Sequence, residues 1–314
     1  VFHHIVGQPQ SEDRLVYEET DPGFFMGVGG SLLDDVIYID IHDHETSEYR
    51  LLSTKDLTAE PVLVAEREEG VEYSMTEGGD VFYILTNADD AKDFKIVEAP
   101  VTAPGRENWK EVVPHEPGRL ILNHMAFARH LVWLERREGL PVIMIRDRKS
   151  GEEHSIAFAE EAYSLGLQGA AEYETDVIRF SYSSMTTPSQ LFDYNMATRE
   201  RTLLKTQEVP SGHDPAKYRV ERFSAKSDDG AEVPVTVLRL ADAKLDGSAP
   251  VLLYGYGSYG ITLPADFRTA RLSLVNRGFI YASSLVTVGL VLLVCLMTAT
   301  VLLWSWGLGP VFTH

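Results

Sequence analysis

The stretch Val251–Gly260, which reads VLLYGYGSYG, decides how the chain is organised. Its first four residues are apolar or aromatic, and they run directly into three glycines interleaved with tyrosines and a serine. A short apolar run of this kind is typical of a buried strand in an α/β sheet, and such sheets hold their chemistry in the loops that follow the strands. Because glycine has no Cβ, the backbone can turn sharply here. The stretch therefore predicts a sheet-edge loop that presents tyrosine hydroxyls.

The same letters also satisfy G-x-G-x-x-G, the glycine pattern of dinucleotide-binding loops. In that motif a helix begins within the glycines, and an acidic residue follows about 20 positions later. Here residues 261–265, which include Pro264, precede any helical pattern, and no Asp or Glu stands near Ile280. We therefore expect neither a dinucleotide nor any other cofactor at this loop.

The charge and the cysteine content of the chain indicate which binding partners and which compartment to expect. Lys and Arg together number 28 against 47 Asp and Glu, which gives a net charge of −19. An acidic chain without basic clusters is a poor partner for nucleic acid, whereas it suits a cationic ligand. Cys295 is the only cysteine, so no internal disulfide can form, and the chain opens on no secretory signal. We expect a cytoplasmic protein, and because Val1 is not an initiator methionine, a chain that begins inside a longer one.

Four short runs rich in β-branched and aromatic residues start 45 to 50 residues apart. They are DVIYIDIH (Asp35–His42), DVFYILTN (Asp80–Asn87), HLVWLERR (His130–Arg137) and VIRFSYSS (Val177–Ser184). A turn and a second strand-like run follow each of them. This period is typical of the blades of a β-propeller. Residues 1–215 are therefore predicted to form a partial β-propeller of about four blades.

Two segments within this part invite a different interpretation. His42, Asp43 and His44 could contribute metal ligands, but no second cluster completes a site, so we predict a hairpin turn and no metal. The string MGVGGS (Met26–Ser31) has the glycines of a phosphate loop. It lacks the Lys and Ser/Thr pair that holds phosphate and metal, so we predict a turn between two strands.

From about residue 216 the pattern changes. Tyr218–Ser227 and Glu232–Leu240 alternate around Asp229–Gly230, which predicts a β-hairpin. A polar linker then leads to the strand at Val251.

A helix and another strand are predicted after the glycine loop. Phe267, Leu272 and Leu274–Val275 fit one face of an amphipathic helix, and Gly278 supplies its left-handed stop. Phe279–Ala282 then begins the next buried strand. This order of elements is that of the front of an α/β-hydrolase sheet, which we assign to residues 216–282.

Five strings in this sequence occur in an order that is itself informative. They are YSSMTTPSQLFDYNMATRE (Tyr182–Glu200), LLKTQEVP (Leu203–Pro210), DDGAEVPVTVL (Asp228–Leu238), YGYGSYG (Tyr254–Gly260) and ADFRTARLSLVNRGFIYA (Ala265–Ala282). In sequence and spacing the chain from Val1 to about Ala282 resembles the prolyl oligopeptidase family of serine peptidases, and within it the oligopeptidase B branch. The resemblance implies a seven-bladed type of propeller without its N-terminal blades, followed by the opening strands and first helix of an α/β-hydrolase domain.

The resemblance also implies an activity and two site residues. Oligopeptidase B cleaves short peptides after Arg or Lys by acyl-enzyme chemistry. Tyr256 matches the family's oxyanion tyrosine, whose hydroxyl donates to the negative oxygen that develops during acyl transfer. Asp266 matches the second of two acidic residues that bind a basic side chain of the substrate, while Pro264 stands where the first would be. Alternatively, Asp266 is an acidic residue that stabilises the N-terminus of a helix, and both interpretations stay open.

The rest of the catalytic machinery is missing from the sequence. The family's nucleophile sits on a G-x-S-x-G elbow, and these 314 residues contain none. Ser258 lies too close to Gly257 to fit the motif, and we interpret it as a loop serine. Every histidine precedes the organising strand except His314, although the family places its histidine last. We therefore expect this chain to be inactive alone.

Residues 283–314 form an apolar tail that does not continue the family pattern. No charged residue stands between Arg277 and His314, and Leu285–Leu308 is long enough to cross a bilayer as a helix, with Trp304 and Trp306 at one interface. Alternatively, the reading frame or gene model departs from the family after Ala282, which the position of the junction within a strand favours.

Two functions follow from these observations. The first is a serine oligopeptidase, present here in a truncated and inactive form. The second is a non-catalytic propeller module that binds a partner and is held at a membrane by residues 285–308.

Overall fold

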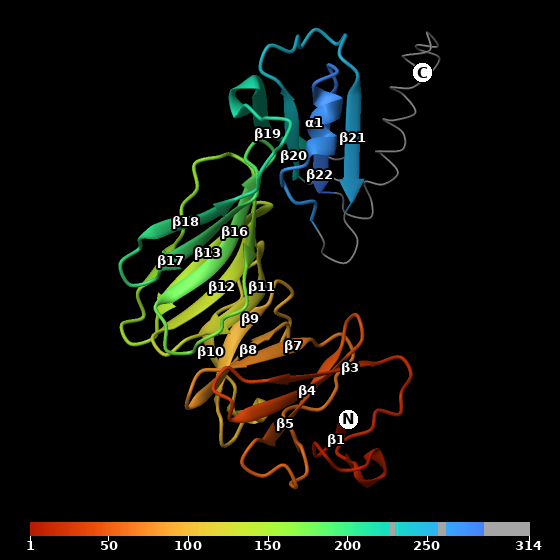
Figure 1. The fold of residues 1–314 in the computed structure, drawn as a ribbon, viewed down its shortest axis with the longest axis vertical. Helices are drawn as coiled ribbons and strands as arrows, with labels where there is room; N and C mark the ends of the chain where they lie inside the picture. Colours follow the sequence, from red (N-terminus) through yellow and green to blue (C-terminus); the bar gives the residue numbers. More distant parts are fainter. Residues whose placement is uncertain (227–229, 231, 257–261, 286–314) are drawn as a thin grey trace.

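A computed structural model describes residues 1–226, 230, 232–256 and 262–285 of the chain. In this part of the chain, four antiparallel sheets of four strands each follow one another along the molecule, and a mixed sheet lies beyond the fourth (Figure 1). A small two-stranded sheet, β1 (Phe2–His3) with β2 (Arg14–Leu15), lies near the N-terminus. Three short 3-10 helices lie in segments between the strands: η1 (Gln10–Glu12), η2 (Arg106–Asn108) and η3 (Pro215–Lys217).

The four antiparallel sheets are the propeller blades, and in each of them the strands pair in sequence order. Blade 1 consists of β3 (Phe25–Gly30), β4 (Val36–His42), β5 (Ser47–Ser53) and β6 (Val62–Leu63). Blade 2 consists of β7 (Tyr73–Glu77), β8 (Val81–Thr86), β9 (Lys95–Pro100) and β10 (Lys110–Val113). Blade 3 consists of β11 (Arg119–Ala126), β12 (His130–Arg137), β13 (Leu140–Asp147) and β14 (Glu153–Ser155). Blade 4 consists of β15 (Tyr163–Leu167), β16 (Val177–Ser184), β17 (Gln190–Asn195) and β18 (Arg201–Thr206).

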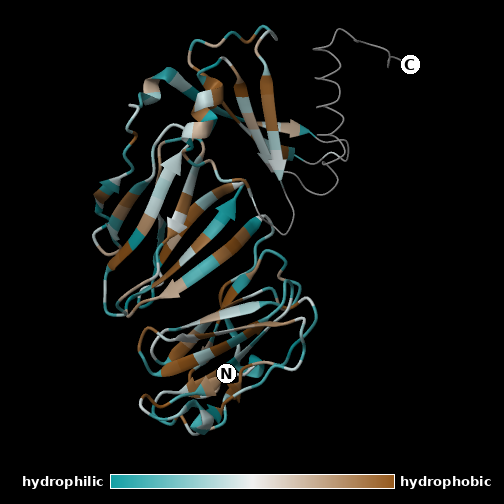
Figure 2. Cartoon of the chain, turned by 45° about the vertical axis from the view of Figure 1, so that its right-hand side comes forward, coloured by the Kyte–Doolittle hydropathy of each residue, from teal (hydrophilic) through white to brown (hydrophobic). Residues whose placement is uncertain are grey.

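The prediction of about four blades is confirmed, and the four apolar runs are the second strands β4, β8, β12 and β16. Their apolar side chains pack in the cores that join one described blade to the next. On β8, Phe82 and Ile84 pack with blade 1, whereas Tyr83 and Leu85 pack with blade 3. The apolar residues that Figure 2 shows within the blades are therefore mainly the core between neighbouring blades.

An arginine also joins neighbouring blades. The guanidinium of Arg148, which follows β13, donates to the hydroxyl of Tyr83 at 2.9 Å and to the carbonyl of Gly78 at 2.7 Å, both in blade 2. It also donates to the Phe127 carbonyl and the Tyr173 hydroxyl, each at 2.9 Å. One side chain thus satisfies acceptors from two blades and from a blade 4 loop.

The prediction for the glycine-rich string at Met26–Ser31 is wrong. Residues 25–30 form β3, which pairs along its whole length with β4. A Cβ at Gly27 would lie 2.5 Å from a carboxylate oxygen of Asp40 on the neighbouring strand, so the Asp40 side chain would have to shift. The string is therefore part of a sheet, and the turn comes only after Gly30.

The interpretation of His42, Asp43 and His44 as a hairpin turn is confirmed. His42 is the last residue of β4, Asp43 and His44 lie in the turn before β5, and the Asp43 carboxylate accepts the backbone N–H groups of Glu45 and Thr46 at 2.8 and 2.7 Å. In the described part of the chain, no group of three or more His, Cys, Asp or Glu side chains is placed to hold a metal ion.

The mixed sheet follows blade 4. Its elements are β19 (Tyr218–Lys226), β20 (Glu232–Leu240), β21 (Val251–Tyr256), α1 (Thr269–Val275) and β22 (Ile280–Leu285). The strand order is β19-β20-β22-β21, in which β22 is antiparallel to β20 and parallel to β21. The chain passes through α1 between the two parallel strands, as a parallel pair requires.

The predicted elements of this sheet are found with small differences. The hairpin and the strand at Val251 are present, and Gly278 has a φ of +88° just after the helix. The helix begins only at Thr269, so Phe267 precedes it, yet Phe267 still packs in the same core.

The predicted membrane segment at 285–308 lies outside the described residues, apart from the backbone of Leu285. Among the residues that the structure does describe, no helix has the length and apolar character that crossing a bilayer would require.

Candidate functional site

The predicted loop begins where β21 ends, and Tyr256 is the last residue of that strand. In the parallel pair, Tyr254 lies opposite Ser283 and Tyr256 lies opposite Leu285. Tyr256 therefore stands at the carboxyl edge of the sheet, the edge at which α/β sheets bind their ligands. The residue is 39% exposed. Residues 257–261, with Ser258 among them, lie outside the described part, and the oxyanion role of Tyr256 stays a prediction.

Asp266 lies on the segment that returns from the loop to α1. It is fixed in place because its neighbours Ala265 and Phe267 are both buried. Its carboxylate pairs with the Nε atom of Arg268 at 2.9 Å and with the Nη2 atom of Arg271 at 3.3 Å. The acidic group is therefore already neutralised by two arginines of this chain, and a basic substrate group would compete with them. The substrate role of Asp266 stays a prediction.

The two arginines differ in how firmly they are held. The Arg271 side chain is only 9% exposed, its guanidinium lies 4.6 Å from the centre of the Tyr281 ring, and its Nη1 donates to the backbone carbonyl of Asp266 at 2.5 Å. The Arg268 side chain is 60% exposed and makes its described hydrogen bonds to the same carboxylate. Arg268 is thus the partner that a cationic ligand could displace with less loss of packing.

The mixed sheet is joined to the propeller by a common apolar core. Ala162 and Met185 of blade 4 and its adjoining loop are buried together with Leu238 and Phe267 of the mixed sheet. His213, on the connection between them, donates from Nε2 to the carbonyl of Thr186 at 2.6 Å, and its ring lies 4.9 Å from that of Phe267. The segment that carries Asp266 is therefore anchored to the propeller.

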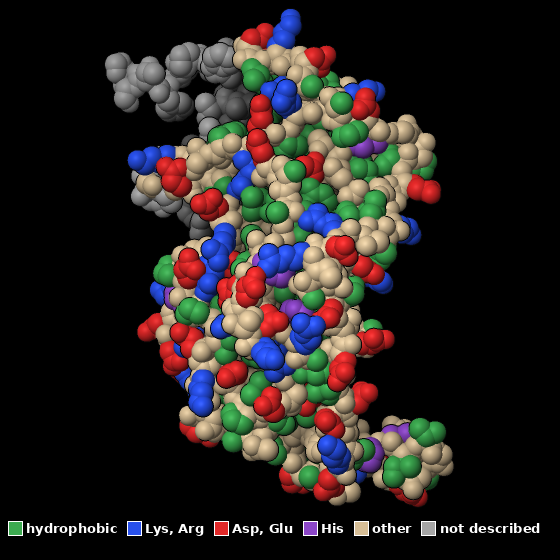
Figure 3. Space-filling model, turned by 90° about the vertical axis from the view of Figure 1, so that its left-hand side faces the viewer, with side chains coloured by type: hydrophobic (Ala, Val, Ile, Leu, Met, Phe, Trp, Pro, Cys, Tyr) green, Lys and Arg blue, Asp and Glu red, His purple; other side chains and the backbone are tan. Residues whose placement is uncertain are grey.

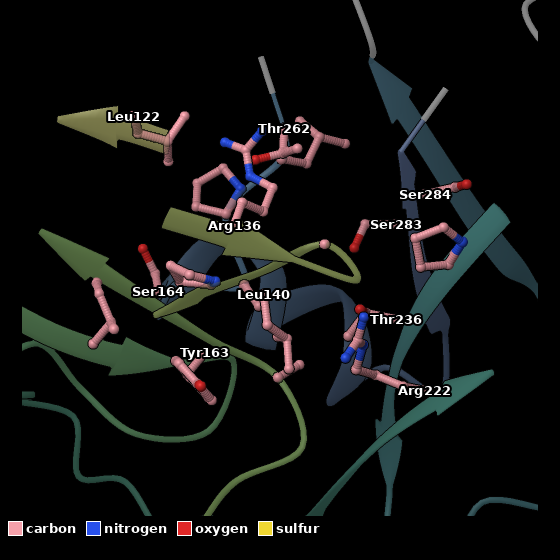
Figure 4. A pocket seen from close by; sticks show the side chains of 18 of the residues that line it. Leu122, Arg136, Leu140, Tyr163, Ser164, Arg222, Thr236, Thr262, Ser283 and Ser284 are labelled. Atoms are coloured by element: carbon pink, nitrogen blue, oxygen red, sulfur yellow. The ribbon is translucent and has the colours of Figure 1, made fainter. Parts of the chain in front are cut away.

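A cavity of about 220 Å³ lies between blade 3, the start of blade 4 and the mixed sheet (Figure 4). Its walls combine apolar side chains with hydroxyl groups and two arginines, Arg136 of β12 and Arg222 of β19. The loop residues Thr262 to Ala265, next to Asp266, form one side of it. This cavity was not foreseen, because strands far apart in the sequence supply its residues and neither arginine stands in a recognisable motif.

The propeller of this chain matches the family model of the prolyl oligopeptidase N-terminal β-propeller domain over residues 1–207. The chain therefore belongs to the prolyl oligopeptidase family, whose members are serine peptidases that act on peptides. The resemblance noted in the sequence is thus confirmed at the level of the family.

Individual relatives extend the match beyond the propeller. Dipeptidyl aminopeptidase BI of Pseudoxanthomonas mexicana is 40% identical over 280 residues, which are 89% of this chain and 38% of the relative. Protease 2 of Moraxella lacunata is 28% identical over 289 residues, covering 92% of this chain and 41% of the relative. The chain thus spans about two fifths of the length of these relatives.

Solved structures give the same result for the fold. Oligopeptidase B of Trypanosoma brucei, with covalently bound antipain, superposes with a TM-score of 0.83 at 32% identity. Oligopeptidase B of Leishmania major gives 0.82 at 31% identity. Each comparison covers 90% of this chain and 41% of the other chain. Because 90% of the chain is more than residues 1–207, the likeness includes part of the mixed sheet.

Proposed function

We propose that this chain is the propeller and the opening of the catalytic domain of a serine oligopeptidase that cleaves short peptides after basic residues. The observation that carries the proposal is Tyr256 at the carboxyl end of β21, in a sheet of order β19-β20-β22-β21 that follows a family propeller. On this proposal, residues 216–282 are the start of an α/β-hydrolase domain, and the Tyr256 hydroxyl donates to the oxyanion of the acyl-transfer intermediate.

The acidic surface supports a basic substrate. The chain carries a net charge of −19, and Figure 3 shows carboxylates spread among the arginines and lysines over one face. Such a field attracts cationic peptides toward the molecule. Asp266 then supplies the local contact for a substrate Arg or Lys, taking it in place of Arg268. With one cysteine in the sequence, the proposal places the protein in the cytoplasm.

The same proposal makes the 314-residue chain inactive alone. It contains an oxyanion donor but no G-x-S-x-G elbow, and a triad without its nucleophile retains only weak catalysis from the oxyanion site and binding.

A chimaera tests the role of Tyr256. The matching 280 residues of the Pseudoxanthomonas mexicana relative are replaced by those of this chain, and hydrolysis of an arginyl fluorogenic peptide is measured. In this chimaera Tyr256→Phe removes only the hydroxyl, and kcat should fall by about 10²- to 10³-fold with little change in KM. Tyr254→Phe on the same strand is the matched control. An unchanged kcat in the Tyr256 variant would refute the oxyanion role, and a chimaera that folds without hydrolysing any peptide would refute the proposed function.

The same chimaera tests Asp266. Asp266→Asn should lower kcat/KM for an arginyl substrate by about 3- to 10-fold, because one charge-assisted contact is lost while Arg268 and Arg271 are released. An alanyl substrate should be affected far less. Asp246→Asn, in an exposed loop, is the control. Equal losses on both substrates would assign Asp266 to helix structure instead of substrate binding.

A further inference from the structure

Two arginines share the carboxylate of Asp266, and each carries the same charged group as the proposed ligand. Oδ1 accepts from Nε of Arg268 at 3.2 Å and from Nη2 of Arg271 at 3.3 Å, while Oδ2 accepts from the same Nε of Arg268 at 2.9 Å. The Asp266 side chain is 25% exposed, so a ligand can still reach it. Two positive charges therefore already face the one negative charge that a basic substrate group would use.

Arg271 is a structural partner of this carboxylate. Its side chain is 9% exposed, and its Nη1 donates to the backbone carbonyl of Asp266 at 2.5 Å. Its guanidinium lies 4.6 Å from the centre of the Tyr281 ring, a contact that is worth most where the cation is shielded from water. Tyr281 itself is buried in the core shared with blade 4. A ligand that replaced Arg271 would break all of these contacts, so we expect Arg271 to stay in place when a ligand binds.

Within the described part of the chain, Arg268 has no comparable support. Its side chain is 60% exposed, and its described hydrogen bonds run from Nε to the two carboxylate oxygens of Asp266. Arg268 stands at the N-cap position of α1, where its backbone is extended with a φ of −140° and its side chain makes no capping hydrogen bond. The helix therefore does not need the guanidinium in order to begin. Arg268 can leave Asp266 by rotation of its side chain alone.

The strength of the pair between Arg268 and Asp266 determines how much it opposes a ligand. Ion pairs of exposed side chains are weak, because water screens the charges and the side chains lose freedom on pairing. A competitor of this strength leaves the carboxylate free for only part of the time, so it lowers the apparent affinity for a cation by about 2- to 6-fold. Because the competitor is attached two residues away, dilution does not remove it.

We propose that Arg268 is an internal competitor at the cationic subsite, whose guanidinium occupies Asp266 until a basic side chain of the peptide replaces it. The inference rests on the proposed function, since it takes Asp266 as the contact for a substrate Arg or Lys, and it names the residue that limits this contact. Competition lowers the affinity for every cation by the same factor. Arg268 therefore weakens binding without changing the preference between Arg and Lys, and a peptide is held firmly only where its further contacts add to this one.

The test is a titration of the full 314-residue chain and does not depend on catalysis. N-acetyl-arginine amide is the probe, and N-acetyl-citrulline amide, which has nearly the same shape without the charge, is the reference ligand. Binding is followed by saturation-transfer NMR. Arg268→Gln should raise the affinity for the arginine probe by about 2- to 6-fold and leave the affinity for the citrulline reference unchanged. The affinity for N-acetyl-lysine amide should rise by the same factor as that for the arginine probe.

Two further variants separate competition from a general effect of charge. Arg277→Gln removes an equal charge just after α1, where Nε of Arg277 donates to the Ser273 carbonyl at 3.2 Å, and it should change the affinity for the probe much less than Arg268→Gln does. In the Asp266→Asn background, Arg268→Gln should no longer raise the affinity, because the competitor and the ligand have lost their common partner. Circular dichroism checks that each variant is folded.

An unchanged affinity for the arginine probe in Arg268→Gln would overturn the inference, as would a gain that Arg277→Gln matches or that persists in the Asp266→Asn background. The absence of binding by Arg268→Gln at millimolar probe would also overturn it. If Asp266→Asn lowers the affinity while Arg268→Gln has no effect, the substrate role of Asp266 stands and only the competitor is refuted. A folded but inactive chimaera would refute the proposed activity without altering the binding result.

Discussion

Strands β8 and β21 show how differently the two parts of the molecule are covered. β8 has a paired strand on each side and packs against blade 1 on one face and blade 3 on the other. β21 pairs with β22 alone among the described strands, and four of its side chains are exposed, namely Val251 at 48%, Leu252 at 40%, Tyr254 at 51% and Tyr256 at 39%. Strands of parallel sheets are usually covered on both faces.

The difference teaches that stability and candidate chemistry lie in different parts of this chain. The middle of the propeller supplies its own core from blade to blade. The strand that carries Tyr256 is held from one side, through β22, α1 and the core that they share with blade 4. Substitutions in the propeller core should therefore lower the free energy of unfolding far more than substitutions on β21.

The largest effect is expected in the propeller core. Phe180 of β16 is fully buried in the cluster that joins blades 3 and 4. Phe180→Ala should lower the free energy of unfolding by about 3 to 5 kcal/mol, because it removes a large apolar side chain and leaves a cavity. Urea unfolding followed by tryptophan fluorescence measures it. Leu203→Ala on the exposed strand β18 is the control and should change little. A similar cost for both would mean that the blades do not form a close-packed core.

A pH effect of intermediate size should come from His124. The residue is 6% exposed, its Nε2 donates to the Tyr83 carbonyl at 2.9 Å, and burial lowers its pKa from 6.5 to about 4. Between these values the unfolded chain binds a proton that the folded chain does not, so stability is lost as pH falls from 6.5 toward 4. The full loss, reached below pH 4, should be roughly 3 kcal/mol, since one pKa unit corresponds to about 1.4 kcal/mol.

The corresponding measurement is urea unfolding at several pH values, with His124→Gln as the comparison. The variant should show a flatter dependence on pH, although not a flat one, because burial also lowers the pKa of His130. An unchanged slope in the variant would show that His124 is not the group that titrates.

The smallest effect is expected on β21. Leu252→Ala should lower the free energy of unfolding by less than about 1 kcal/mol, since the side chain is substantially exposed. Leu238→Ala on β20, whose side chain is fully buried in the core shared with blade 4, should cost about 3 kcal/mol. Thermal unfolding of the two variants side by side would sharpen the contrast. If Leu252→Ala were the more costly change, β21 would be covered in solution.

The comparison also explains which elements the sequence could predict. The second strands of the blades were visible as short runs rich in β-branched and aromatic residues because most of these side chains pack in the cores between blades. The outer strand β18 has every residue exposed, and β3 is rich in glycine, so neither carries a recognisable pattern. The string at Met26 was misassigned because the sequence alone does not distinguish glycines within a strand from glycines in a turn.

The sequence could predict only those residues of the candidate site that lie within a single motif. Tyr256 and Asp266 stand within a single stretch of the chain, so the family pattern locates them. The pairing of Asp266 with Arg268 and Arg271 needed the structure, because the sequence does not show which of several nearby charges approach one another. Arg136 and Arg222 line one cavity only because a blade and the mixed sheet pack against each other, and no local pattern in the sequence predicts that packing.

The central claim is that this chain holds an oxyanion tyrosine at a sheet edge and no nucleophile for it to serve. Labelling with a fluorophosphonate probe for activated serines tests it most directly, using the 314-residue chain beside the chimaera described above. The account predicts that the chimaera is labelled at one serine outside residues 1–282 of this chain, while the chain itself stays unlabelled. A covalent adduct on any serine of this chain would contradict it.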